Sequence, residues 1–306
     1  MHDLLRVADL GSAELFDVLE TAIATKSDPA SVRGAAAGKV VAVLFEKPSL
    51  RTRFSVEAAL ARLGAHPIGA YDREVGLGTR ESLDDAARVL ERYVDAIVIR
   101  TFAHDRVASL ARYAEVPVIN ALSDAHHPLQ GLADVMTIAE ARCAGDVRAL
   151  KEVKVAWVGD GNNVANSLIE TCALVGADIA LAMPSGHEPD GEVVAWAKDQ
   201  GISVDVTGDP AAAVAGADVV STDVWASMGQ EDQSEARKAL FEPYRVTSEL
   251  MALAAPDAIF LHCLPAHRGE EVAAEVIDGA ASRVFDQAEN RLHTTLAVFL
   301  HSWGLR

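Results

Sequence analysis

Short runs of apolar residues alternate with helix-forming segments along almost the whole chain. In the first half such runs lie at 40–45, 96–99 and 116–120, and in the second half at 153–158, 178–183, 202–206, 219–224 and 259–263. Apolar runs of this length, linked by helices, are typical of parallel strands that are buried on both faces. The sequence therefore predicts an α/β protein built on doubly wound parallel sheets, with ligands bound beyond the carboxyl ends of the strands.

The alternation occurs in two blocks, which predicts two domains. The chain has 306 residues, of which 50% are apolar, and this is enough for two such domains with their own cores. A long helix predicted at 131–142 carries the chain from the first block into the second.

Acidic residues outnumber basic ones, 45 to 27, and the formal charge is −18. This balance argues against binding to nucleic acid or to an anionic membrane, because both require a basic surface. An acidic surface that is poor in lysine fits a salt-rich cytoplasm, but an ordinary acidic enzyme can look the same. Activity and melting temperature measured from low to multimolar KCl distinguish these two interpretations. A protein that is most stable in dilute buffer would rule out adaptation to a salt-rich cytoplasm.

No apolar run approaches the length needed to cross a membrane, and residues 1–3 lack a basic segment followed by an apolar one. We therefore expect a soluble, cytoplasmic protein. The three cysteines, Cys143, Cys172 and Cys263, form no close pair. Their spacing argues against a disulfide framework and against a thiolate zinc site.

The first apolar run ends at a turn that carries several hydrogen-bond donors. Ser49 is a suitable N-cap for the helix that follows. The free N–H groups at the start of a helix bind anions, and Arg51, Thr52 and Arg53 add donors at the same end. Such a set suits a phosphate better than a neutral ligand. The alternative is a capped helix with two solvated arginines.

Two further strand ends in the first block carry polar residues. Arg100 follows the second apolar run, and His127 and Gln130 follow the third. Because the carboxyl ends of parallel strands meet at one edge of a sheet, we expect these residues to share a cleft with Ser49. An imidazole and a guanidinium placed there could polarise a carbonyl oxygen. A histidine beside a strand end can instead be purely structural.

In the second block, Gly159-Asp160-Gly161-Asn162-Asn163 follows the first apolar run and invites a dinucleotide interpretation. The third glycine of that pattern is missing, because Val164 holds its place, and the next strand ends without an acidic residue for a ribose. The segment therefore argues against NAD, and no cofactor is expected. We interpret it as a strand-to-helix turn that offers the Asn163 side chain to a carboxylate or ammonium group.

Asp223 and Ser227 follow another strand of the second block. The carboxylate could bind an ammonium group, with help from the hydroxyl. A helix-capping aspartate is the alternative.

The last predicted strand ends in His262 and Cys263, a pair that suggests a metal site. Adjacent residues of a strand point to opposite faces, so the two are not expected to ligate one ion, and no metal is predicted. We expect Cys263 to contact a substrate amine instead. Pro265 is expected to force an extended conformation on Leu264, whose carbonyl would face the ligand.

Four segments, in this order and spacing, resemble the aspartate/ornithine carbamoyltransferase family and its ornithine carbamoyltransferases in particular: 45–53, 127–130, 223–229 and 262–269. The resemblance covers almost the whole chain and includes 289–291. The first two segments would fit any carbamoyltransferase. The last two point to ornithine as the acceptor.

The resemblance implies transfer of the carbamoyl group of carbamoyl phosphate to the δ-amine of L-ornithine, which gives L-citrulline and phosphate. The same site would serve arginine biosynthesis or the reverse, catabolic direction. The implied fold is two parallel-sheet domains bridged by two helices. Residues 1–135, completed by a C-terminal helix at 290–306, would bind carbamoyl phosphate, and residues 136–289 would bind ornithine. The implied assembly is a homotrimer, or a multiple of trimers, with sites between subunits.

The resemblance also implies roles for individual residues. Carbamoyl phosphate would be bound by Ser49, Leu50 (through its N–H), Arg51, Thr52, Arg100, His127, Gln130 and Arg291. Ornithine would be bound by Asn163, Asp223, Ser227, Met228, Cys263 and Leu264. The catalytic set would be Arg100, His127, Asp223 and Cys263.

Two positions depart from the family pattern. Leu50 stands where the family usually has threonine, which removes a hydroxyl and keeps a backbone donor. Gly76 falls where a glutamine would reach the carbamoyl phosphate of a neighbouring subunit. Two other functions remain open: a carbamoyltransferase with another amine acceptor, such as putrescine or an acylated ornithine, and a non-catalytic module that binds a phosphate ligand.

Overall fold

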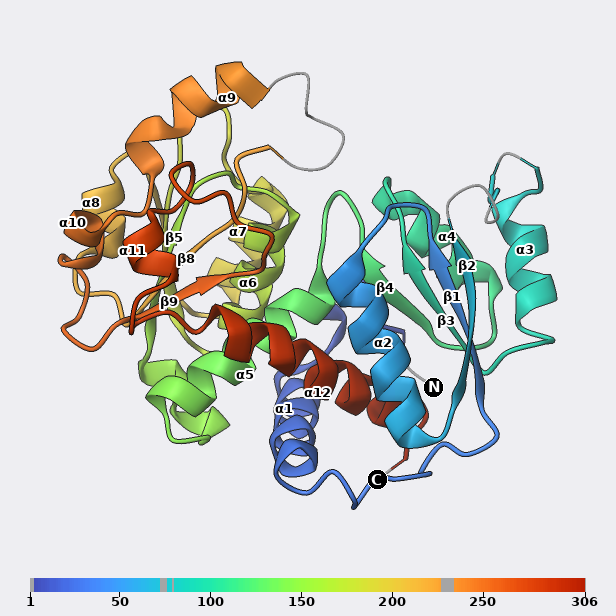
Figure 1. Ribbon diagram of the computed structural model, residues 1–306. Helices are drawn as coiled ribbons and strands as arrows, with labels where there is room; N and C mark the ends of the chain where they lie inside the picture. Colours follow the sequence, from blue (N-terminus) through green and yellow to red (C-terminus); the bar gives the residue numbers. More distant parts are fainter. Residues whose placement is uncertain (1–2, 72–75, 79, 227–233, 306) are drawn as a thin grey trace. The chain divides into compact units, whose positions relative to one another are not determined.

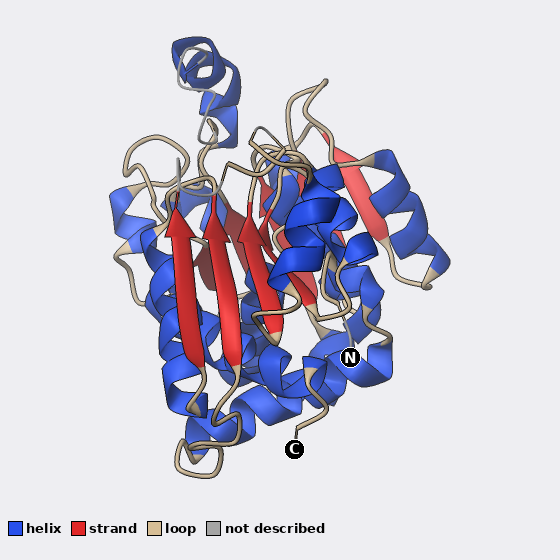
Figure 2. Ribbon diagram, turned by 90° about the vertical axis from the view of Figure 1, so that its right-hand side faces the viewer, coloured by secondary structure: helices blue, strands red, loops and turns tan. Residues whose placement is uncertain are grey.

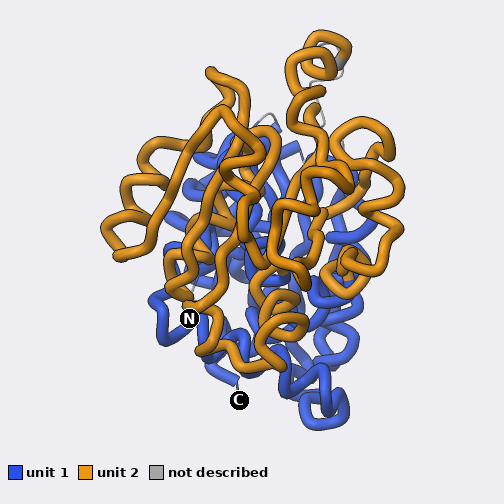
Figure 3. The backbone as a smooth tube through the Cα atoms, turned by 90° about the vertical axis from the view of Figure 1, so that its left-hand side faces the viewer, with its two compact units in different colours: residues 1–133, 289–306 blue, residues 134–288 orange. Residues whose placement is uncertain are grey.

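The computed structural model describes residues 3–71, 76–78, 80–226 and 234–305. The chain divides into two compact units (Figures 1 and 3). Unit 1 comprises Met1–Ala133 and Glu289–Arg306, and unit 2 comprises Asp134–Ala288. Both boundaries fall within long helices, α5 (Pro128–Arg142) and α12 (Val284–Ser302), so each of these helices contributes residues to both units.

Unit 1 contains a four-stranded sheet in the order β2-β1-β3-β4, in which all neighbouring strands are parallel (Figure 2). The strands are β1 (Val40–Phe45), β2 (His66–Tyr71), β3 (Ala96–Arg100) and β4 (Val118–Leu122). From β1 the chain moves first to β2 on one side and then to β3 on the other. The carboxyl ends of β1 and β3 therefore flank the topological switch point, where open parallel sheets bind their ligands.

Both faces of the unit 1 sheet are buried, as the predicted apolar runs require. The helices are α1 (Ser12–Ser27), α2 (Leu50–Leu63), α3 (Leu83–Leu90) and α4 (His104–Tyr113), with a 3-10 turn at Val7–Asp9. On one face, residues such as Leu44 and Ile97 form a core with α3 and α4. On the other face of the same strands, Val43 and Val98 have no exposed surface.

Unit 2 contains a five-stranded parallel sheet in the order β7-β6-β5-β8-β9. Its strands are β5 (Lys154–Val158), β6 (Asp178–Ala182), β7 (Val204–Thr207), β8 (Val219–Thr222) and β9 (Ile259–His262). The strand order reverses between β5 and β8. These two strand ends flank the second switch point of the chain.

Six helices lie wholly within the described part of unit 2. They are α6 (Asn163–Val175), α7 (Gly191–Asp199), α8 (Pro210–Val214), α9 (Ser234–Phe241), α10 (Ser248–Met251) and α11 (Ala274–Ile277), with 3-10 helices at Val147–Glu152 and Glu242–Tyr244. Helix α6 is buried from Val164 to Val175, which identifies it as a central packing element. Among the described residues, no helix combines the length and apolarity needed to cross a membrane.

The predicted fold class of two doubly wound parallel-sheet domains is confirmed, and all eight predicted strands are present with ends shifted by up to two residues. Strand β2 was missed, because Pro67 and Gly69 disfavour a strand. It lies at the edge of the sheet, the position where such residues are tolerated. The final helix begins at Val284, earlier than the start at residue 290 that the family resemblance implied.

Candidate active site

The turn from β1 into α2 has the predicted capped geometry. Ser49 has an extended backbone, and its Oγ accepts from the Thr52 N–H at 3.3 Å. Helix α2 therefore begins at Leu50, shortly after β1, one of the two strands that flank the switch point of the unit 1 sheet. The leucine side chain has no hydrogen-bond donor, so Leu50 can serve an anion only through its backbone N–H.

Arg291, from the part of α12 that belongs to unit 1, makes three polar contacts in the same region. Its Nη1 donates to Gln130 Oε1 at 2.8 Å and lies 3.5 Å from His127 Nε2. Its Nη2 donates to Thr52 Oγ1 at 3.2 Å. All four side chains are at least 95% buried. Residues from α2, α5 and α12 are thus joined in one buried polar network.

The pKa of His127 reflects its burial and the positive charges near it. Burial lowers the pKa of His127 well below its ordinary value of 6.5, and the positive charges of Arg291, Arg100 and Arg51 lower it further. The histidine is therefore neutral, and three guanidinium groups are close enough to act on it. We refer to Arg51, Arg100, Arg291 and His127 as the basic cluster.

Two further charged residues, Glu46 and Lys47, lie in the turn after β1. Burial and the charge of Arg100 lower the pKa of Lys47, whose Nζ lies 4.2 Å from the ring centroid of Phe102. Glu46 is paired with Arg106 at 2.6 Å, so its negative charge is compensated beside the site.

Arg53, the other arginine of the first turn of α2, makes different contacts. Its Nε donates to Glu57 Oε1 at 2.8 Å, and its guanidinium lies 4.1 Å from the ring centroid of Tyr71. The Tyr71 hydroxyl donates to the same Glu57 oxygen at 2.7 Å. The structure therefore places Arg53 with Glu57 and Tyr71, in contrast to the expectation that it adds a donor beside Arg51.

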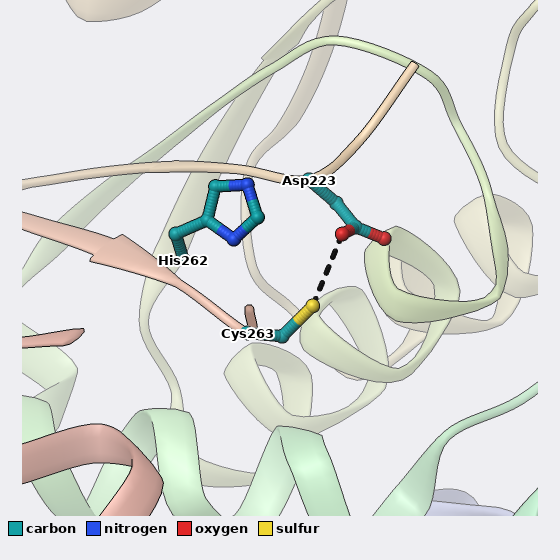
Figure 4. A group of neighbouring side chains, drawn as sticks. All are labelled: Asp223, His262 and Cys263. Atoms are coloured by element: carbon teal, nitrogen blue, oxygen red, sulfur yellow. Dashed lines mark hydrogen bonds between the residues drawn. The ribbon is translucent and has the colours of Figure 1, made fainter. Parts of the chain in front are cut away.

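In unit 2, Asp223 directly follows β8 and accepts hydrogen bonds from residues that follow two other strands. It is 6% exposed. Asn162, the N-cap of α6, donates from Nδ2 to Asp223 Oδ2 at 2.9 Å. Cys263, just beyond β9, donates from Sγ to Asp223 Oδ1 at 3.0 Å (Figure 4). Both carboxylate oxygens are thereby held in fixed positions, and the thiol is directed toward them.

A buried histidine–carboxylate pair holds the end of β9. His262 and Glu271 have no exposed surface, and His262 Nε2 lies 3.2 Å from Glu271 Oε1. The other ring nitrogen, Nδ1, accepts from the Leu264 N–H at 2.9 Å. Leu264 has a φ of 58° and precedes a cis proline, so the predicted extended conformation of Leu264 is wrong. The hydrogen bond from its N–H helps to hold this left-handed backbone.

The expectation that His262 and Cys263 point to opposite faces of a strand is wrong. His262 and Cys263 do not act on opposite sides, because β9 ends at His262 and the chain turns there. Ligand atoms of Asp223, His262 and Cys263 lie within 4.8 Å of one another. These atoms are engaged in the hydrogen bonds just described, so a cation would have to displace that network.

Two of the predicted site residues, Ser227 and Met228, lie outside the described residues, and one residue of the site was not predicted. Asn163 begins α6, and its neighbour Asn162, which was not predicted, donates to Asp223. The sequence offered a signal for Asn162, since asparagine directly before an apolar helix is a strong N-cap.

The chain is similar to known proteins over almost its whole length. Residues 2–140 match the family model "Aspartate/ornithine carbamoyltransferase, carbamoyl-P binding domain", and residues 151–302 match "Aspartate/ornithine carbamoyltransferase, Asp/Orn binding domain". The chain is 50% identical over 294 residues to an ornithine carbamoyltransferase of Acidothermus cellulolyticus, covering 95% of this chain and 93% of that protein. It is 48% identical over 303 residues to an anabolic ornithine carbamoyltransferase of Pyrococcus furiosus, covering 97% and 95%. The solved ornithine carbamoyltransferase structure from Pyrococcus furiosus superposes with a TM-score of 0.93 at 47% identity, covering 100% of this chain and 98% of that one.

We predict that His127 makes the protein less stable as the pH falls. The unfolded chain protonates this histidine near its ordinary pKa of 6.5, whereas the folded protein does so only at lower pH. Between these values the unfolded state binds more protons, so the free energy of unfolding decreases with decreasing pH. Urea unfolding at several pH values from about 7.5 to about 5 should give a shallower pH dependence for His127→Gln than for the wild type. Identical slopes would show that His127 titrates normally in the folded protein.

Proposed function

Because the chain belongs to the aspartate/ornithine carbamoyltransferase family, we propose that it transfers the carbamoyl group of carbamoyl phosphate to the δ-amine of L-ornithine. The products are L-citrulline and phosphate. The basic cluster is the observation that carries this proposal. Three guanidinium groups around a neutral histidine, in a chain with a formal charge of −18, form a local site for a multiply charged anion.

We propose that the start of α2 binds the phosphate group. The N–H of Leu50, the hydroxyls of Ser49 and Thr52 and the guanidinium of Arg51 are the donors at this end of the helix. Helix N-termini favour anions, and charge-assisted hydrogen bonds to phosphate are stronger than neutral ones. Ser49 Oγ caps the helix by accepting from Thr52, which leaves its own proton available to the ligand.

We propose that the carbamoyl group lies against Arg100, His127 and Gln130, and that Arg291 contacts the same ligand. Arg291 already fixes Gln130 and Thr52, so one guanidinium spans the residues proposed for both ends of carbamoyl phosphate. A neutral His127 can donate one hydrogen bond to the carbonyl oxygen without adding a fourth positive charge.

Ornithine is proposed to bind at Asn163, Asp223, Ser227, Met228, Cys263 and Leu264, in the unit that matches the Asp/Orn binding domain model. The Asp223 carboxylate supplies the negative charge that an ammonium group requires. It is held by Asn162 and Cys263, so little reorganisation is needed when the ligand binds. Leu264, next to Cys263, is proposed to contribute its backbone carbonyl, since its N–H is bonded to His262.

The proposed reaction forms a bond between the δ-nitrogen and the carbamoyl carbon and breaks the bond from that carbon to the phosphate oxygen. An alkyl amine has a pKa of about 10.4, so it must lose a proton before it attacks. That first proton leaves to solvent, and Asp223 and Cys263 orient the free amine. Once the new C–N bond forms, the nitrogen loses its second proton to the departing phosphate. Arg100 and His127 stabilise the oxyanion of the tetrahedral intermediate, and the Ser49–Thr52 turn stabilises the phosphate as it leaves.

We further propose that the protein assembles as a homotrimer or a multiple of trimers, and that it acts in the cytoplasm. Leu50, Phe54 and Ile68 of unit 1 are more than half exposed in the single chain, as expected for apolar residues that an assembly covers. The three free cysteines fit a reducing compartment. A monomeric mass by light scattering would contradict the assembly, and a disulfide formed by the native protein in the cell would contradict the compartment.

We predict that the protein prefers ornithine among amine acceptors. Purified protein is incubated with carbamoyl phosphate and, separately, ornithine, putrescine, an acylated ornithine and aspartate. Each carbamoylated product is then quantified. Citrulline should form fastest, since the Asn163 amide suits the α-carboxylate of an amino acid, which putrescine lacks. A faster reaction with putrescine or the acylated ornithine would show that this amine, and not ornithine, is the preferred acceptor. The absence of any product would contradict the proposed function.

We also predict that the two arginines of the first α2 turn differ in function. Arg51→Ala should lower kcat/KM by about a hundredfold, because removing one transition-state donor typically costs about 3 kcal/mol of barrier. Arg53→Ala is the matched control, since Arg53 binds Glu57 and Tyr71 instead, and it should retain activity within about threefold. Circular dichroism should show both variants folded. Near-normal turnover in Arg51→Ala, or equal losses in both variants, would contradict the assignment.

A further inference from the structure

Arg237 of α9 is a buried arginine that none of the proposed substrate contacts uses. It is 9% exposed, and its guanidinium joins two turns of unit 2 that are far apart in the sequence. Its Nη2 donates to Asp160 Oδ2 at 2.6 Å, and its Nε donates to the backbone carbonyl of Trp225. The guanidinium also lies 5.2 Å from the ring centroid of Phe241, one helical turn further along α9.

Both turns lead directly to residues of the proposed ornithine site. Asp160 follows β5 and lies two residues before Asn162, which donates to Asp223. Trp225 lies two residues after Asp223 itself. The Arg237 bridge and the Asn162–Asp223 hydrogen bond therefore connect the same two strand ends, those of β5 and β8, at the switch point of the unit 2 sheet.

The β5 turn is also fixed from its other side. His187 Nδ1 lies 3.1 Å from Asp160 Oδ1, and the Gly161 N–H donates to the His187 carbonyl at 2.9 Å. A Cβ on Gly161 would come within 2.3 Å of the Pro189 backbone nitrogen, so the turn packs directly against this segment. Burial raises the pKa of Asp160 while the charge of Arg237 opposes the rise, which identifies Arg237 as the main partner of this carboxylate.

We propose that Arg237 is a positioning residue for ornithine: it sets the spacing between the β5 turn, which carries Asn162 and Asn163, and the β8 turn, which carries Asp223. Arg237 does not contact the ligand in this role. It acts because its planar guanidinium can bond a carboxylate and a carbonyl at the same time, a geometry that lysine or glutamine cannot reproduce. The inference rests on the proposed function, since it concerns the binding site for ornithine.

The test is a steady-state comparison of Arg237→Gln and Arg237→Lys with the wild type, in which each substrate is varied in turn. We expect Arg237→Gln to raise the KM for ornithine by about tenfold or more, because small misplacements of binding groups are costly. The KM for carbamoyl phosphate should change by less than about twofold, since unit 1 supplies that site. Arg237→Lys should give an intermediate ornithine KM, as it keeps a charge for Asp160 but cannot also bond Trp225.

Arg142 provides a matched control within the same unit. It is similarly buried and pairs with Asp218 at 2.9 Å and with Asp257 at 2.5 Å, but Asp218 precedes β8 and so lies at the opposite end of the sheet. Arg142→Gln removes a comparable ionic contact and should leave the KM for ornithine within about twofold of the wild type. An equal rise in Arg142→Gln and Arg237→Gln would show a general loss of stability and overturn the inference.

If Arg237→Gln fails to fold by circular dichroism, Asp160→Asn decides the question, because it removes the charge while keeping the shape of the side chain. The same selective rise in the ornithine KM is expected. An unchanged ornithine KM in the variants, with normal citrulline formation by the wild type, would overturn the inference and leave the proposed function intact. Failure of the wild type to form citrulline would overturn both.

Discussion

Burial of positive charge around His127 is the constraint on which the rest of the candidate site depends. Arg51, Arg100 and Arg291 all lower the pKa of this histidine, so their charges act at one buried point. Concentrating like charges in a region of low dielectric is unfavourable unless an anion compensates them. Arg100 and Arg291 are each at least 95% buried, so solvent screens them little. A doubly charged acyl phosphate such as carbamoyl phosphate would offset this cost if it binds here as proposed, and Arg291 is meanwhile held by neutral acceptors, Gln130 and Thr52.

The topology of the two sheets explains why the polar residues gather where they do. In unit 1 the strand order reverses between β1 and β3; Ser49 and Arg51 follow β1, and Arg100 is the last residue of β3. In unit 2 the reversal is between β5 and β8, and Asn162 and Asp223 follow them. Under the proposed function, each unit would use its switch point for one ligand class, with guanidinium groups in the first and a carboxylate held by hydrogen bonds in the second. The two matched family models assign these units to carbamoyl phosphate and to the amino acid in the same order.

Much of this could be predicted from sequence because local patterns encode it. The apolar runs specified the buried strands, and Ser49 specified the start of α2. Features that depend on distant residues were not predictable. Strand β2 contains Pro67 and Gly69 and exists because the edge of the sheet accepts them. The pairing of Arg53 with Tyr71 depends on that missed strand.

The same limit applies in unit 2. The left-handed conformation of Leu264 depends on His262, whose ring orientation is set by Glu271. The Arg237–Asp160 pair joins residues separated by 77 positions, and neither residue has a local pattern that marks it. Residues that touch a ligand can often be identified from short motifs, whereas residues that hold those motifs in place are visible only in the folded chain.

The central claim is that the basic cluster is an anion site. The most direct test is a calorimetric titration of carbamoyl phosphate into the wild type and Arg291→Gln in the absence of ornithine. We expect one molecule bound per chain, and we expect Arg291→Gln to weaken binding by at least about tenfold, since a charge-assisted contact contributes about 1.5 kcal/mol or more. Equal affinity in the two proteins, with both folded, would show that the positive charge around His127 does not serve this ligand.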